Sequence, residues 1–318
     1  MKSIQYDFIA KPKIAIMPTT AKQAKPFLKW AGGKGQLIEQ LTKHLPLDLK
    51  AGRVRKYFEP FLGGGALFFW LSQRYNFESI FLNEINPVVT NCYKVIQGKV
   101  NKLVENLRQL EKEYLAASEA GREAFYYKRR EEFNELMFSK AANSNVRKAA
   151  LLIFLNKTCF NGLFRVNSQG EFNVPFGRYK NPTICDEDNL RAASKCLHRA
   201  KITCADFSKC LDNADSESFV YFDPPYRPIS ATSNFTGYSK YAFNESEQRR
   251  LHDVFVELAE RSAYVMLSNS DPKNVDSMDD FFDELYENYT IKRLNATRLI
   301  NCNANRRGTV SEVLITNY

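Results

Sequence analysis

Residues 220–226 read VYFDPPY, an aromatic and β-branched run that stops at an aspartate, two prolines and a tyrosine. Such a run is typical of a buried strand, so Asp223 would stand where the strand ends, with Pro224 and Pro225 stiffening the turn. The Asp223 carboxylate and the Pro224 carbonyl could each accept one N–H of a flat amine. The ring of Tyr226 offers a surface on which a base can stack. The tetrapeptide therefore predicts an amine held in one orientation for attack on an electrophile.

Three further acids end predicted strands in the same way. Glu59, Glu84 and Asp206 each stand at or just past the carboxyl end of a β-rich run. In an open parallel sheet these ends form one rim, and ligands bind in the crevice outside it. Carboxylates gathered on one rim repel each other, so we expect a ligand with hydrogen-bond donors or positive charge.

A glycine stretch, EPFLGGGA, follows the first of these strands. Gly63 and Gly65 would let the backbone approach a ligand closely before a helix begins. Glu84, about 20 residues further on, suits a carboxylate that holds ribose hydroxyls. AGGKGQ at 31–36 lacks the spacing of a phosphate-binding P-loop. S-adenosylmethionine carries ribose hydroxyls, an ammonium and a sulfonium but no phosphate, and it is the cofactor that this rim predicts.

The elements that must position these residues alternate along the chain. Strands are predicted within 54–61, 79–84, 201–206, 218–223 and 263–269, and helical patterns follow them. This alternation predicts an α/β fold with a mostly parallel sheet. Residues 288–294 and 309–318 depart from it and predict a terminal hairpin with an antiparallel edge strand.

Residues 99–185 interrupt the alternation with helical patterns alone. One amphipathic pattern runs from Val100 to Leu110, and a second, more apolar helix is expected at 149–157. We therefore expect an inserted, mainly helical domain at 99–185, a main domain formed by 25–98 and 186–318, and a basic mobile tail at 1–24.

The charge of the chain favours a polyanionic partner. The formal net charge is +9, and the segment from Lys140 to Lys180 holds seven basic residues against one acid, Glu171. Aromatic residues are interleaved with these charges: Phe160, Phe164, Phe172, Phe176 and Tyr179. A solvated basic face and a nucleic-acid surface both fit this pattern.

Several functional classes are disfavoured by composition. The seven cysteines form no C-x-x-C pair, and the three histidines have no zinc-ligand spacing, so we expect free thiols and no metal. No apolar run approaches the roughly 18 residues that span a membrane. Without a signal-peptide pattern, we expect a soluble protein of the reducing cytoplasm. The sequence does not fix an oligomeric state, and a monomer is favoured.

Long motifs resemble a known family. They are KPFLKWAGGKGQL, YFEPFLGGGALFFWL, NKTCFNGLFRVNSQGEFNVPFGRYKNP, DPPY and EVLITNY, in this order from about Lys25 to Tyr318. Together they resemble the DNA adenine-N6 methyltransferases of the type that modifies GATC. The resemblance implies a Rossmann-like S-adenosylmethionine-dependent methyltransferase sheet with an inserted DNA target-recognition domain at 99–185.

The resemblance also implies roles for single residues. The catalytic residues would be Asp223, Pro224, Pro225 and Tyr226. The cofactor would be bound by Trp30, Lys34, Glu59, Gly63, Gly65, Glu84, Asp206, Phe207 and Asp223. DNA would be bound by Lys29, Phe160, Asn161, Leu163, Arg165, Pro175 and Arg178. Two positions depart from the family pattern, since Glu84 stands for its usual aspartate and Phe160 for its frequent tyrosine.

The expected function is methyl transfer from S-adenosylmethionine to N6 of adenine in double-stranded DNA, with the base flipped out of the helix. GATC is the expected site, with Arg165 as the best reader of guanine and Lys29 as a second. Leu163 and Pro175 would contact a thymine methyl group, and Arg178 a phosphate. Two alternatives stay open: a methyltransferase that acts on RNA or a protein amide, and a DNA-binding relative that no longer catalyses.

Overall fold

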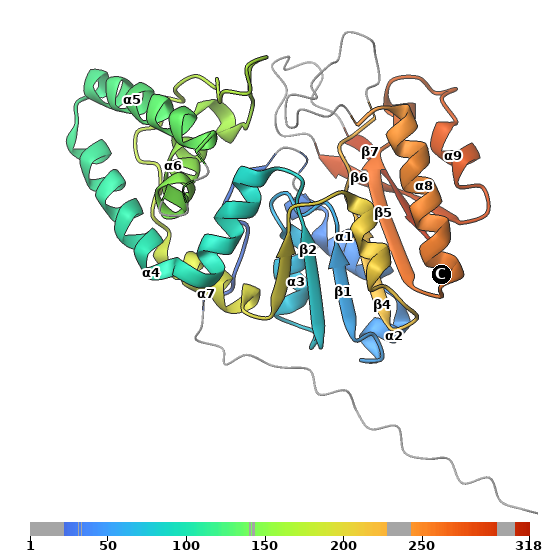
Figure 1. The fold of residues 1–318 in the computed structure, drawn as a ribbon. Helices are drawn as coiled ribbons and strands as arrows, with labels where there is room; N and C mark the ends of the chain where they lie inside the picture. The colour runs from blue at the N-terminus through green and yellow to red at the C-terminus, as the bar shows by residue number, and fades with distance from the viewer. Residues whose placement is uncertain are drawn as a thin grey trace, which may run out of the picture.

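The computed structural model describes residues 22–30, 32, 34–139, 141, 144–227, 243–297 and 309–318. Within these residues, seven strands form one sheet in the order β3-β2-β1-β4-β5-β7-β6 (Figure 1). The strands are β1 Lys56–Glu59, β2 Ser79–Asn83, β3 Ala200–Thr203, β4 Ser218–Phe222, β5 Tyr264–Ser270, β6 Thr290–Thr297 and β7 Thr309–Thr316.

The first five strands are parallel, and β7 is antiparallel to both of its neighbours. The strand order reverses between β1 and β4, because β2 and β3 lie on one side of β1 and the later strands on the other. A crevice for ligands forms at such a reversal, outside the carboxyl ends of the strands. The fold is a Rossmann-like α/β methyltransferase fold, and the predicted fold class is confirmed.

Helices surround the sheet. The α-helices are α1 Ile38–Leu41, α2 Leu47–Lys50, α3 Ala66–Ser72, α4 Pro87–Ala116, α5 Glu119–Met137, α6 Asn145–Thr158, α7 Glu187–Leu197, α8 Glu245–Glu260 and α9 Phe281–Leu285. Short 3-10 helices are η1 Lys34–Gln36, η2 Thr42–His44, η4 Phe160–Gly162, η5 Phe207–Asp212 and η6 Pro272–Asn274.

Each face of the sheet has its own hydrophobic core, because side chains along a strand alternate between faces. Tyr221 of β4 belongs to the core that includes buried residues of α3, α4 and α6. Its neighbour Phe222 belongs to the second core, which α8 and α9 cover. All five residues of β4 are buried, so the strand that leads into the tetrapeptide is held from both sides.

The chain between β2 and β3 forms a helical lobe beside the sheet, in which α4, α5 and α6 pack together (Figure 1). Its described residues contribute no strand to the sheet, and only two isolated β-bridges occur there, Cys159 with Phe176 and Val166 with Phe172. α4 enters the lobe from the sheet and is interrupted at Lys99, whose φ of −140° is not helical. The expected start of the insert at residue 99 therefore coincides with a break in a helix.

Some local expectations differ from the structure. The run at 201–206 is followed only by the 3-10 helix η5. β1 and β3 are shorter than the β-rich runs that predicted them. The predicted terminal hairpin is present, with β6 at the edge of the sheet. Residues 1–21 of the predicted tail lie outside the described residues, whereas Lys22 forms an ion pair of 2.7 Å with Asp186. The last part of that segment is thus tied to the fold.

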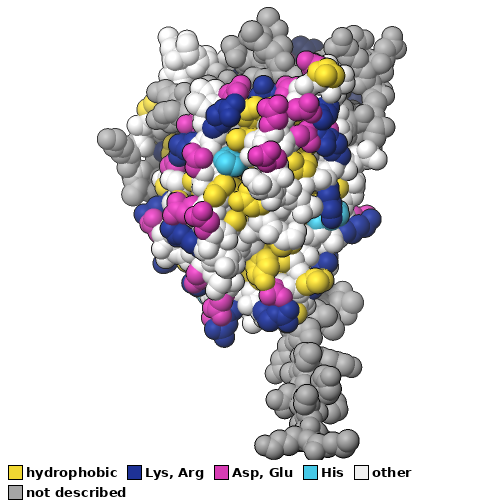
Figure 2. Space-filling view, turned by 90° about the vertical axis from the view of Figure 1, so that its right-hand side faces the viewer, with side chains coloured by type: hydrophobic (Ala, Val, Ile, Leu, Met, Phe, Trp, Pro, Cys, Tyr) yellow, Lys and Arg dark blue, Asp and Glu magenta, His cyan; other side chains and the backbone are white. Residues whose placement is uncertain are grey.

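The surface over α8 and α9 carries mixed charge. Acidic and basic side chains are interspersed on this face, without a patch of one sign (Figure 2). Where the chain is described, no helix is long and apolar enough to cross a membrane. The cysteines of that part of the chain are free thiols.

Candidate functional site

Asp223 follows the last residue of β4 and faces a buried lysine. The Nζ of Lys34 lies 3.0 Å from Oδ1 of Asp223 and 2.8 Å from Oε2 of Glu312 in β7. It also donates to the hydroxyl of Tyr226 at 2.8 Å. Tyr226 in turn donates to Oε1 of Glu312 at 2.8 Å. The first and last residues of the tetrapeptide are therefore joined through one ammonium group.

Two acceptors of the tetrapeptide stay open. Oδ1 of Asp223 is taken by Lys34, with Ser268 at 3.5 Å, whereas Oδ2 has no partner among the described residues. The carbonyl of Pro224 likewise accepts no hydrogen bond from that part of the chain, while the carbonyl of Pro225 accepts one from Gln248 at 3.2 Å. The turn thus fixes its own geometry and leaves one carboxylate oxygen and one carbonyl for another donor.

Burial shifts the charges in this group. Burial raises the pKa of Asp223 to about 6, while Lys34 opposes the shift and Glu312 adds to it. Burial alone would lower the pKa of Lys34, but its negative neighbours, Asp223 first, outweigh burial and raise that pKa well above its usual value. The side chains of Asp223 and Glu312 thus flank one buried cation.

Glu59, the last residue of β1, is buried close to this group. Its Oε2 accepts the hydroxyl of Tyr57 at 2.5 Å. Burial raises the pKa of Glu59 to about 8; the hydrogen bond from Tyr57 opposes this, and the charge of Asp223 adds to it. A side chain of this kind is mostly uncharged at pH 7, and a cation placed beside it would favour its ionised form.

Glu84, just past β2, fastens the glycine loop. Its Oε2 accepts the N–H of Gly63 and its Oε1 the N–H of Asn86, each at 2.9 Å. Each oxygen keeps a second lone pair for a ligand hydroxyl. The hydroxyl of Tyr93 donates to the carbonyl of Gly63 at 2.9 Å, so this loop is held from both sides.

The glycines of this loop are required by space and by backbone. Gly63 and Gly65 have φ of +46° and +66°, a region that side chains disfavour. A Cβ on Gly63 would lie 2.8 Å from the ring of Trp30, and one on Gly65 would lie 2.9 Å from the hydroxyl of Tyr93. The ring of Trp30 lies over the glycine loop and also stacks on Phe164 of the helical lobe, with centroids 6.0 Å apart.

Asp206 and Phe207, just past β3, have partners within the protein. Arg250 of α8 donates to both carboxylate oxygens of Asp206 at 2.8 Å, and this hydrogen bonding lowers the pKa of Asp206 far below its usual range. The guanidinium lies 4.0 Å from the ring centroid of Phe207. Phe61 stacks on the same ring at 5.3 Å, and Phe207 is only 4% exposed. Little of this ring is left for a ligand.

Lys29 lies beside the helical lobe. The side chain of Asn156 in α6 accepts the N–H of Lys29 at 2.7 Å, and its NH₂ donates to the carbonyls of Lys29 and Gly162 at 2.9 and 2.8 Å. The Nζ of Lys29 lies over the ring of Tyr179, 4.7 Å from its centroid. A surface pocket there is lined by Lys29, Lys157, Tyr179, Lys180, Asn181, Pro182 and Thr183.

Of the other predicted DNA-contacting residues, Asn161 contacts the lining of this pocket. The N–H of Phe160 donates to the carbonyl of Pro175 at 2.9 Å, and that of Asn161 to the hydroxyl of Tyr179 at 3.1 Å. Phe160 is 49% exposed, so its ring is accessible to a partner. Leu163 is half-buried against the core.

The two predicted arginines differ in their surroundings. Arg165 is exposed and donates from Nε to the side-chain oxygen of Asn173 at 2.7 Å, which fixes the direction of its guanidinium. Arg178 is 69% exposed, and its guanidinium lies 3.7 Å from a carboxylate oxygen of Glu123. Arg165 is therefore oriented by a neutral partner, whereas Arg178 is loosely paired with an acid.

Sequence reasoning missed three residues that shape the site. Glu312 lies in the EVLITNY motif, where an acid directly before a buried run was a usable signal. Arg250 and Asn156 gave no such signal, because an arginine on an amphipathic helix and an asparagine in an apolar one have many possible partners.

Comparison with known proteins agrees with this geometry. A family model for the D12 class N6 adenine-specific DNA methyltransferase matches residues 30–300. The type II methyltransferase M.MjaIII of Methanocaldococcus jannaschii is 50% identical over 297 residues, which cover 93% of this chain and 100% of the relative. DNA adenine methylases of Haemophilus influenzae and Escherichia coli are 34% and 33% identical, covering 91% and 92% of this chain and 92% and 95% of their own lengths. The predicted family is confirmed: the chain belongs to the D12 class of N6 adenine-specific DNA methyltransferases.

Proposed function

We propose that this DNA adenine-N6 methyltransferase uses S-adenosylmethionine to methylate a flipped adenine in double-stranded DNA, within GATC. The observation that carries the proposal is the pair of open acceptors on the tetrapeptide, Oδ2 of Asp223 and the carbonyl of Pro224. An exocyclic amine has two N–H groups, and two rigid acceptors hold both of them. This directs the nitrogen lone pair away from the acceptors and toward an electrophile.

Base flipping is supported by the depth of these acceptors. Asp223 is largely buried and Pro224 is buried, so an adenine inside a duplex cannot reach them without leaving its stack. The hydroxyl of Tyr226 is fixed by Lys34 and Glu312. Because the orientation of the Tyr226 ring is fixed, the extruded base can stack on a rigid surface.

The residues of the rim fit S-adenosylmethionine. Glu84 keeps a free lone pair on each oxygen for ribose hydroxyls, and the glycine loop allows the backbone to come close. Glu59 and Asp223 would favour the ligand's ammonium and sulfonium. When bound, the cofactor supplies the electrophilic methyl group. Because Phe207 is nearly covered, we assign Asp206 and Phe207 to the wall of the adenine pocket, held by Arg250.

We assign DNA recognition to residues 99–185 and catalysis to 25–98 and 186–318. The pocket beside Lys29 is lined by two further cations, Lys157 and Lys180, and by the ring of Tyr179. GATC is supported by the likeness of residues 156–182 to the recognition segment of GATC methylases. Arg165, oriented by Asn173, is suited to bind guanine through two hydrogen bonds. The protein would act as a monomer at the nucleoid, in the cytoplasm.

Incubation of unmethylated plasmid with the protein and labelled S-adenosylmethionine tests the proposal. The incorporated label should be N6-methyladenine, and the plasmid should resist a GATC endonuclease that N6-methyladenine blocks. An endonuclease that cuts GATC regardless of adenine methylation is the control. Full cutting by the sensitive enzyme after verified incorporation of the label would reject GATC as the recognition site. Label found in added RNA or protein instead of DNA would reject double-stranded DNA as the substrate.

A further inference from the structure

Glu312 completes the hydrogen bonding of the Lys34 ammonium. That group has three N–H donors, and they are matched by Asp223 at 3.0 Å, Glu312 at 2.8 Å and the hydroxyl of Tyr226 at 2.8 Å. The side chain of Lys34 is only 2% exposed and that of Glu312 is 12% exposed. Water therefore cannot readily take the place of Glu312 as an acceptor for the ammonium. A buried ammonium without its full set of acceptors is costly, and this set is complete.

Glu312 is also the only partner, within the described residues, that contacts both Lys34 and Tyr226 through a carboxylate. We propose that Glu312 is a positioning residue for methyl transfer, which fixes the ring of Tyr226 and the Oδ1 of Asp223 through the Lys34 ammonium. The inference rests on the proposed roles of Asp223 and Tyr226 and adds a third side chain to them. With Glu312 in place, Asp223 can present only Oδ2 to the amine.

The sheet holds Glu312 at this point. It pairs with Ser270, the last residue of β5, and with Leu294 of β6. A strand with neighbours on both sides cannot slip by one residue without turning its side chains to the other face. A slip of that kind would exchange Glu312 for Ser311 or Val313.

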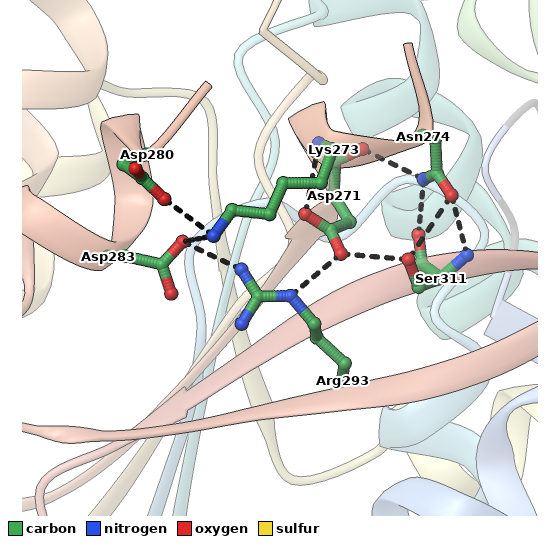
Figure 3. Close-up of polar contacts among 7 residues, drawn as sticks. All are labelled: Asp271, Lys273, Asn274, Asp280, Asp283, Arg293 and Ser311. Carbon is green, nitrogen blue, oxygen red and sulfur yellow. Dashed lines mark hydrogen bonds and ion pairs between the residues drawn. The ribbon is translucent and has the colours of Figure 1, made fainter. Parts of the chain in front are cut away.

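A polar cluster beside the end of β5 fixes the register further (Figure 3). Asp271 is nearly fully buried, and its Oδ2 accepts the hydroxyl of Ser311 at 2.7 Å and Nε of Arg293 at 2.9 Å. The side chain of Asn274 accepts the N–H of Ser311 at 2.9 Å and donates to its carbonyl at 2.7 Å. Every polar group of Ser311 is thus engaged, one residue before Glu312.

Asp283 extends the same cluster. It accepts from Arg293 at 2.6 Å and lies 3.1 Å from the Nζ of Lys273, which also pairs with Asp280 at 2.5 Å (Figure 3). The end of β5, η6, α9 and the β6–β7 hairpin are therefore tied together on one side of Glu312. The cluster fixes the register of Glu312 in the sheet, and Glu312 in turn fixes the side chains at the two ends of the tetrapeptide.

Glu312→Gln tests the inference, with Glu287→Gln, an exposed glutamate after α9, as the matched control. Glutamine keeps the volume but turns an NH₂ or a neutral oxygen toward Lys34. We expect kcat to fall on the order of tenfold to a hundredfold, because small displacements of reacting groups cost up to about that much. The KM for DNA should change little, since β7 lies toward the opposite end of the sheet from β2 and β3, beside which the lobe stands (Figure 1).

The pH profile separates positioning from a merely structural role. The groups that act on Asp223 are Lys34, Glu312, Ser268, Tyr221, Tyr226 and Glu59. Glu312 adds to the raised pKa of Asp223, so the acid limb of kcat, expected near pH 6, should move to lower pH in Glu312→Gln. Glu312→Asp, which keeps the charge, should leave the limb near its original pH.

The rate is read as methyl transfer to plasmid DNA of mixed sequence, normalised to the folded fraction by thermal unfolding. A Glu312→Gln enzyme with the kcat and acid limb of Glu287→Gln would overturn the inference, as would a loss explained entirely by unfolded protein. A wild-type enzyme that methylates DNA outside GATC would contradict the proposed site alone. Failure of the inference and failure of the proposed site are thus told apart.

Discussion

Lys34 and Asp223 lie 189 positions apart in the chain, yet the ammonium of Lys34 is 3.0 Å from Oδ1 of Asp223. The ion pair decides which carboxylate oxygen faces the lysine and which faces outward. A carboxylate is needed for this division, because it accepts hydrogen bonds at both oxygens. An amide would accept at one atom and donate at the other.

Asp223→Asn should therefore abolish methyl transfer while DNA binding survives. If the amide oxygen stays toward Lys34, the NH₂ faces the amine and two donors oppose each other. Loss of one oriented group of this kind typically costs on the order of a hundredfold or more in kcat. Single-turnover rates and a gel-shift titration would measure the two effects separately. Turnover near the wild-type rate would refute the role of Asp223.

Binding of S-adenosylmethionine should release a proton from Glu59 below about pH 8. The pKa of Glu59 is raised to about 8, so the free protein holds this proton at pH 7. A bound cation favours the carboxylate, and affinity should thus rise with pH up to about 8 and then level off. Calorimetry in buffers of different ionisation enthalpy would count the protons.

Glu59→Gln is the control for this titration, because the α-amino group of the cofactor titrates in the same range. The difference in proton release between wild type and variant isolates Glu59. Equal proton release by both proteins would show that Glu59 does not respond to the cofactor.

Gly63→Ala should impair cofactor binding more than it affects the fold. Its Cβ would lie 2.8 Å from the ring of Trp30, and its φ of +46° is strained for alanine. The ring or the loop must shift, and the N–H held by Glu84 would move with the loop. Cofactor titration by tryptophan fluorescence would detect the loss.

Gly98→Ala is the matched control, because a Cβ at that position of α4 meets nothing within 4 Å. Because alanine fits at this position without a clash, the variant should keep both the fold and the cofactor affinity of the wild type. Identical cofactor affinities for the two alanine variants would remove the steric argument for Gly63.

Arg165→Ala should reduce discrimination between bases at one base pair of the site, whereas Arg178→Ala should weaken binding to DNA of every sequence alike. A bidentate arginine–guanine contact is worth about 1–3 kcal/mol against the wrong base, while a phosphate contact carries no sequence information. Methylation rates on duplexes with single substitutions in GATC would measure both effects. If Arg165→Ala lowered the methylation rate equally on all of these duplexes, Arg165 would contact the DNA backbone and not a base.

Local patterns predicted the parts of the site that follow strands. Glu59, Glu84 and Asp223 end runs whose composition marks them as strands, and parallel strands bring such ends together. Pairings between distant segments were not predictable in this way. Glu312 meets Lys34 across 278 positions, and Arg250 meets Asp206 across 44. Each of these pairings depends on how the helices are oriented and on the order of the strands in the sheet, and the periodicity of the sequence encodes neither.

The domain boundary shows the same limit. Periodicity predicted a helical insert that starts at residue 99, the position at which α4 is interrupted. It could not show that Trp30, far outside the insert, stacks on Phe164 within it. An aromatic residue beside a glycine turn gives no sign of which distant ring it will meet.

The bridge from Asn156 to Lys29 has an evolutionary consequence. A recognition module that is exchanged as a cassette must end at boundaries that carry few contacts. Here a cut at the ends of the insert would leave Lys29 and Trp30 with the old enzyme and their partners Asn156 and Phe164 with the new one. Recombination of the insert alone would break those contacts. On the proposed role of the insert in DNA recognition, new sequence specificity should therefore arise by point substitution at the contacting side chains. Chimeric enzymes should be built with the N-terminal segment and the insert taken from one parent.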